Sequence, residues 1–73
     1  HMAKKKLNPA ELVAARFGGV WVAPAKLGYA SATVIYYWIE RGGSIRDPKR
    51  VLSKAKQLGI PFTAEECIHG GYE

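Results

Sequence analysis

The fold is decided by the stretch LGYASATVIYYWIERGG, which runs from Leu27 to Gly43. Gly28 permits the positive backbone angles of a tight turn, and Ser31 belongs to the residue types that cap the start of a helix. The pair Gly42–Gly43 is typical of a helix end. The stretch therefore predicts a tight turn followed by a helix from Ser31 to about Arg41.

The two sides of this expected helix differ in polarity. At about 3.6 residues per turn, Ile35, Trp38 and Ile39 share one side, and burying the first two stabilises the fold by roughly 1.5–3 kcal/mol each. The other side carries Thr33, Tyr36, Tyr37 and Glu40. Exposed tyrosines indicate a contact surface, because aromatic rings usually bury their area. A short helical segment, a turn and a helix with one free face form the pattern of a helix-turn-helix, whose second helix enters the major groove of DNA.

Two more helices are expected before this stretch. The first runs from Pro9 to Phe17, with Asn8 as its cap and two glycines after it. The second is expected within Val20–Leu27, where Pro24 lacks a backbone donor. The proline therefore either kinks a helix over this whole range or stands in the first turn of a helix that begins near Ala23.

Two helices are expected after it. Asp47 followed by proline is a capping signal, so a helix is predicted over Pro48–Leu58, with an inward side of Val51, Leu52, Ala55 and Leu58. Thr63 and an acidic residue three positions later open a short last helix through Ile68. No segment is a convincing strand. The predicted class is all-α, a compact five-helix bundle.

The length of 73 residues, 48% of them hydrophobic, predicts one domain. We expect a tag remnant and a basic arm over residues 1–7, the folded domain over residues 8–69 and a flexible tail over residues 70–73. So small a domain is marginal alone, which favours a homodimer, with Trp21, Val22 and the last helix as candidate surfaces. The longest apolar run, residues 34–39, is too short to span a membrane.

The charge balance predicts a polyanionic partner. Eleven Lys and Arg against six Asp and Glu give a net charge of +5. Candidate DNA phosphate contacts cluster around the central stretch: Lys26, Arg41, Arg46, Lys49 and Arg50. An N-terminal run could follow a DNA groove as an arm or remain disordered: Lys4, Lys5 and Lys6. A basic face that is merely solvated is the alternative for each cation.

Residues for catalysis or metal binding do not assemble in the sequence. Cys67 and His69 stand two apart without a second pair, which argues against zinc. A single cysteine cannot form an internal disulfide and fits a reducing cytoplasm. No nucleophile–base set and no phosphate-loop pattern is present. We therefore expect no enzyme activity, no metal, no cofactor and no small-molecule ligand, and we expect Cys67 in the core.

Four motifs together carry a resemblance to a known group: LVAARFGG, AKLGYA, WIERGG and LGIP. Over residues 9–68 the chain resembles the small Cro-like (YdaS-like) helix-turn-helix regulators of phages and proteobacterial prophages. The resemblance implies a Cro/repressor-like bundle that binds operator DNA as a homodimer in the bacterial cytoplasm and represses transcription. By position, the base contacts implied are Ser31, Ala32, Thr33, Tyr36 and Tyr37.

Other functions fit the same surface. An activator or an architectural DNA-binding protein would need the same DNA contacts. A protein-binding adaptor would instead place Tyr36 and Tyr37 against a helix of its partner. Since the implied turn is about one residue longer than the tightest form of the motif, the base contacts could also shift by one position.

Overall fold

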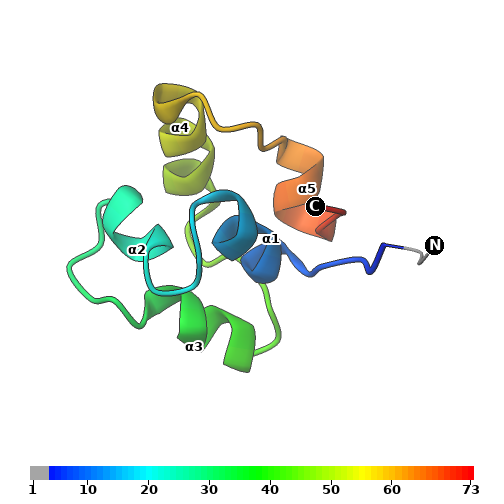
Figure 1. The fold of residues 1–73 in the computed structure, drawn as a ribbon, viewed down its shortest axis with the longest axis horizontal. Coiled ribbons are helices and arrows are strands. Elements are labelled where there is room, and N and C mark those ends of the chain that lie inside the picture. The colour runs from blue at the N-terminus through cyan, green and yellow to red at the C-terminus, as the bar shows by residue number, and fades with distance from the viewer. Residues whose placement is uncertain (1–3) are drawn as a thin grey trace.

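Helix α1 lies at the centre of the fold, and the other helices surround it (Figure 1). The computed structural model describes residues 4–73, so the expected tag remnant His1–Met2 lies outside the described residues. The elements in chain order are α1 (Pro9–Arg16), α2 (Ala23–Lys26), α3 (Val34–Glu40), α4 (Pro48–Leu58) and α5 (Ala64–His69). Residues 4–73 hold no strand beyond one isolated bridge, which confirms the all-α, five-helix class. No helix within this range is long and apolar enough to cross a membrane.

The start of α1 is fixed by the predicted cap. The Asn8 side chain accepts a hydrogen bond of 2.8 Å from the Glu11 backbone N–H, and the Glu11 carboxylate accepts one of 3.0 Å from the Asn8 N–H. Two donors that the helix leaves unpaired are thereby satisfied. The structure confirms this capping box and a helix that begins at Pro9.

Helix α2 is only four residues long. It begins at Ala23, and Pro24 is its second residue, where a missing N–H leaves no helical hydrogen bond unmade. Residues 20–22 form turns rather than helix. The expectation of a start near Ala23 is therefore confirmed, and the expectation of a helix across Val20–Leu27 is wrong.

Helix α3 begins three residues later than expected. The Ser31 hydroxyl does not cap the helix but accepts a hydrogen bond of 3.3 Å from the Thr33 N–H and lies 2.8 Å from the Thr33 hydroxyl. Serine side chains often close such local turns, which compete with capping. Residues 32 and 33 form a turn, and the helix runs over Val34–Glu40.

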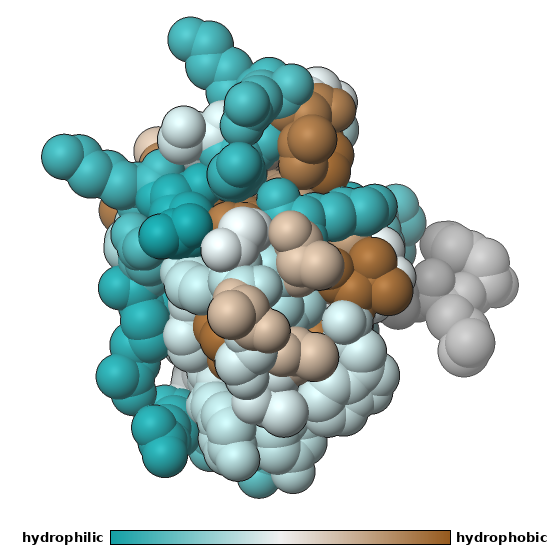
Figure 2. All heavy atoms as spheres, turned by 90° about the vertical axis from the view of Figure 1, so that its left-hand side faces the viewer, coloured by the Kyte–Doolittle hydropathy of each residue, from teal (hydrophilic) through white to brown (hydrophobic). Residues whose placement is uncertain are grey.

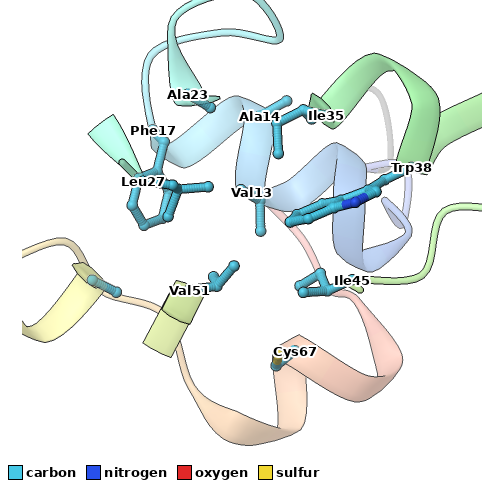
Figure 3. Packing of buried hydrophobic residues seen from close by; sticks show 12 residues of the cluster. Val13, Ala14, Phe17, Ala23, Leu27, Ile35, Trp38, Ile45, Val51 and Cys67 are labelled. Atoms are coloured by element: carbon cyan, nitrogen blue, oxygen red, sulfur yellow. The ribbon is translucent and has the colours of Figure 1, made fainter. Parts of the chain in front are cut away.

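All five helices contribute to the core, α2 through Ala23 (Figure 3). Ile35 and Trp38 of α3 are buried as predicted, and Cys67 lies at the bottom of the cluster in α5. Leu58 is a correction, because 48% of it is exposed. The end of α4 that carries Leu58 points away from α1 (Figure 1), and in its last turn Ala55 is buried while Leu58 is exposed.

Gly71 and Tyr72 form hydrogen bonds with distant parts of the chain, contacts that the prediction of a loose tail at residues 70–73 did not include. Leu7 and Gly71 exchange two backbone hydrogen bonds of 2.8 and 3.0 Å. Arg16 donates a hydrogen bond of 2.9 Å to the Tyr72 carbonyl. Gly70, at φ +76°, turns the chain back toward Leu7, and a side chain there would overlap the Leu7 carbonyl. The segments around Leu7 and Gly71 therefore lie side by side (Figure 1).

Candidate nucleic-acid interface

An exposed row of three aromatic rings and one guanidinium runs over the outer side of α3. Trp21 stacks on Tyr36, with ring centroids 5.5 Å apart and planes at 21°. Tyr36 meets Tyr37 edge-on at 5.7 Å, and the Arg41 guanidinium lies 5.4 Å from the Tyr37 ring centre. We call these four residues the aromatic ladder. Its rings remain 56%, 40% and 48% exposed in this order, so the ladder is open to a partner.

Trp21 is the member of the ladder that the sequence did not place beside Tyr36. It stands in the turns between α1 and α2, fifteen positions before Tyr36. Helical spacing cannot relate two residues that belong to different elements. The only signal in the sequence was a large aromatic residue in a segment with no inward periodicity.

The five residues implied as base contacts form one continuous strip. Ser31 and Ala32 are exposed in the turn before α3, and Thr33 is half-buried at the helix start. Tyr36 and Tyr37 follow on the exposed side of the helix. The strip and the aromatic ladder share these two tyrosines, so the structure brings the candidate base contacts together on one side of the molecule.

The candidate phosphate contacts differ in whether their side chains already bind other residues of the fold. Lys26, Arg41, Arg46 and Lys49 are exposed, and no hydrogen bond or salt bridge to another residue of the range 4–73 engages their side chains. In the view toward α2, strongly hydrophilic side chains line one edge of the face beside a paler area (Figure 2). Within residues 4–73, the side chains of these four cations therefore remain available to a polyanion.

Arg50 is different because its guanidinium is already engaged. It donates a hydrogen bond of 3.2 Å to the Leu27 carbonyl at the end of α2 and pairs with Asp47 at 3.2 Å. It also lies 4.7 Å from the ring centre of Tyr29. Burial, followed by the nearby Asp47 charge, raises the pKa of Tyr29, so the phenol keeps its proton. Arg50 thus ties the segment before α3 to α4.

The basic arm lies away from this surface. Lys4, Lys5 and Lys6 are exposed, and Lys4 donates a hydrogen bond of 2.9 Å to the Glu73 carbonyl. The chain enters the fold on the side of α5, at the end of the long axis opposite to α2 (Figure 1). The structure therefore does not bring the arm together with the strip at residues 31–37.

The thiol of Cys67 is buried, and burial raises its pKa. Within residues 4–73, no three His, Cys, Asp or Glu side chains are grouped so that they could hold a metal ion. The chemistry available at the candidate interface is therefore that of aromatic rings, hydroxyl groups and cations.

Comparison of the chain with known protein families, characterised proteins and solved structures finds no match. The case for a function accordingly rests on the surface just described.

Proposed function

We propose that the protein binds duplex DNA sequence-specifically as a transcriptional regulator. In this proposal α2, the turn at residues 27–33 and α3 act as a helix-turn-helix, and α3 enters the major groove. The observation that carries it is the exposed side of α3, where Tyr36 and Tyr37 stand beside Arg41, which forms no salt bridge within residues 4–73. The net charge of +5 supports a polyanionic partner.

The residues of the surface suit separate roles in such a complex. The tyrosine hydroxyls can bond base edges, and their rings can pack on thymine methyl groups. Ser31, Ala32 and Thr33 precede the helix and would meet the adjacent bases or phosphates. Four exposed cations would contact the phosphates of the DNA backbone: Lys26, Arg41, Arg46 and Lys49.

Repression by operator occupancy is the regulatory mechanism we favour. A homodimer bound across a promoter would exclude polymerase, and its two α3 helices would read half-sites about one helical turn apart. Sedimentation with and without DNA tests the homodimer, which a monomer in both conditions would overturn. A reporter assay separates repression from activation, since the two require opposite changes in transcription.

Selection of duplexes from a random pool, followed by fluorescence anisotropy, tests the proposal. We expect the selected duplex to bind at least about 1000-fold more tightly than a scrambled one, the lower end of specific regulators. Measurement at two salt concentrations should show weaker binding at higher salt. Equal affinity for both duplexes would overturn sequence-specific binding.

A protein-binding adaptor is the second candidate, and the aromatic ladder favours it. Trp21 and Tyr36 together present stacked apolar surface of the kind found at the centres of protein interfaces. This function requires capture of a protein partner that varies little with salt, and no binding of the duplex pool. The anisotropy measurement therefore distinguishes the two functions.

A further inference from the structure

A hollow opens beside the aromatic ladder, along one side of α3. Its volume is about 200 Å³, far above the ~10–15 Å³ that one water molecule needs. Its lining consists of Val34, Tyr37, Trp38, Arg41 and Arg46. The hollow thus combines one aliphatic and two aromatic side chains with two guanidinium groups, one from the end of α3 and one from the loop that follows.

The two charged residues that line the hollow, Arg41 and Arg46, are both positive. No acidic residue lines it, and neither arginine forms a salt bridge with any residue in the range 4–73. Each arginine has an acidic neighbour in the chain: Asp47 is already paired with Arg50, and Glu40 is exposed and does not line the hollow. An anion in the hollow would therefore meet two guanidinium groups and no carboxylate in the lining.

Trp38 adds a donor that the fold leaves unused. Only 7% of its surface is exposed, yet its indole N–H donates no hydrogen bond to the described residues. The described part of the chain also contains no fully enclosed side-chain nitrogen without a partner. The indole nitrogen therefore keeps a solvent contact, and Trp38 meets open space at the hollow that it lines. A buried indole N–H usually finds a partner.

We propose that this hollow binds a phosphate group, held by the Arg41 and Arg46 guanidiniums and by the Trp38 indole N–H. Guanidinium groups match the geometry of phosphate oxygens, and such charge-assisted bonds are stronger than neutral ones. That the phosphate belongs to a DNA backbone rests on the proposed function. Because Tyr37 and Arg41 belong to both the ladder and the hollow, a backbone phosphate seated there would fix the position of α3 along the groove.

Nuclear magnetic resonance of the two indole N–H groups tests the site without any DNA. Sodium phosphate is added to the full chain at constant ionic strength, with sodium chloride as the reference. We expect the Trp38 indole resonance to shift with saturation, while the exposed Trp21 resonance in the same spectrum moves little. An equal shift in chloride, or no shift of Trp38, would overturn the site.

Two variants that each remove one positive charge complete the test. We expect Arg46→Ala to weaken phosphate binding about tenfold, the loss of one charge-assisted bond. Lys56→Ala is the matched control, because Lys56 is exposed and does not line the hollow. It should leave the affinity within about twofold, as for screened surface charges. Equal losses in the two variants would indicate a general charge effect and overturn the site.

A random-sequence duplex distinguishes the two sources of phosphate. If the duplex shifts the Trp38 resonance and competes with inorganic phosphate, the hollow takes a backbone phosphate. If phosphate binds and the duplex does not, the hollow is a site for a free phosphate anion, and the proposed DNA-binding function is wrong. If the duplex binds without moving Trp38, DNA binding stands and the hollow is not its phosphate site.

Discussion

The Arg16 guanidinium and the Glu66 carboxylate form two parallel hydrogen bonds of 2.6 and 2.9 Å between α1 and α5. Arg16 also donates to the Pro61 and Tyr72 carbonyls, at 3.0 and 2.9 Å. Glu66 in turn accepts the Thr63 N–H at 3.0 Å, which completes the capping box of α5. One ion pair, with both side chains less than a quarter exposed, therefore joins α1, the start of α5 and the C-terminal residues.

The Arg16–Glu66 pair predicts a loss of stability in acid. The hydrogen bonds from Arg16, followed by that from Thr63, lower the pKa of Glu66 in the folded chain. A carboxylate with a lowered folded pKa stabilises the fold above its unfolded pKa, and this contribution is lost as the pH falls through the folded value. We expect the loss to begin near pH ~4.3, the ordinary pKa of a glutamate, and to continue below it.

Chemical denaturation of Glu66→Gln between pH 7 and pH 3 measures this contribution. At pH 7 the variant should unfold about 1–3 kcal/mol more easily than the parent chain, and the difference should shrink in acid. Glu65→Gln is the control, because Glu65 is exposed in the same helical turn. A difference that stays constant with pH would contradict the assignment.

Gly43 packs against the cap of α1, which predicts a cost for any side chain there. Its carbonyl accepts the Ala10 N–H at 2.9 Å, its φ is +82°, and an added Cβ would overlap the Asn8 side chain. Gly43→Ala should destabilise the fold by about 1–2 kcal/mol of backbone strain and about 1 kcal/mol for the displaced cap. Gly42→Ala, at φ +108° with open space around its Cβ, should cost only the strain.

A double-mutant cycle checks that the extra cost comes from Asn8. With the Asn8→Ala change already made, the side chain that Gly43→Ala would displace is gone. Urea denaturation should therefore give the double variant more stability than the sum of the single effects predicts. Strict additivity would show that the two positions do not interact.

The parts of this fold that could be predicted are those that depend on neighbours in the sequence. The cap of α1 at Asn8, the cap of α4 at Asp47 and the capping box of α5 at Thr63 each involve residues three positions apart, and all three form as expected. The inward side of α3, with Ile35 and Trp38, follows from helical periodicity in the same way.

The parts that could not be predicted depend on contacts between distant segments. The Ser31 side chain could cap a helix or close a turn. The sequence allows both hydrogen bonds, and in the fold its hydroxyl accepts the one from the Thr33 N–H. The C-terminal residues form hydrogen bonds with Leu7 and Arg16, which lie more than fifty positions away. The stacking of Trp21 on Tyr36 and the engagement of Arg50 by Leu27 are likewise contacts between different elements.

Arg50 and Lys49 are neighbours in sequence, but their substitution should affect the stability of the fold differently. Arg50→Ala removes the Leu27, Asp47 and Tyr29 contacts and should destabilise the fold by about 1 kcal/mol, a modest figure because the side chain is 41% exposed and water screens its charge. Lys49→Ala should leave stability within about 0.5 kcal/mol. Urea denaturation of both variants measures the difference, and equal stabilities would contradict the role of Arg50.

If the proposed function holds, Lys49→Ala should weaken DNA binding more than Arg50→Ala does, although Arg50→Ala costs more stability. Lys49 is exposed and unpaired within residues 4–73, so Lys49→Ala should weaken binding to every duplex alike and reduce the salt dependence by about one charge. Arg50 keeps its donors within the fold, so Arg50→Ala should affect DNA binding less. A sequence-dependent loss in Lys49→Ala would mean that Lys49 contacts a base.

The aromatic ladder predicts that Tyr37 and Trp21 affect specificity in different ways. Tyr37→Ala should weaken binding to the selected duplex by about 1–3 kcal/mol and leave the scrambled duplex almost unchanged, as expected for a base contact. Trp21→Ala removes the ring stacked on Tyr36, so it should lower the same specificity ratio through the position of Tyr36. Tyr72→Ala is the control, because it removes an exposed tyrosine ring outside the ladder. If anisotropy gives the same specificity ratio for all three variants and the parent chain, α3 does not present its tyrosines to the bases.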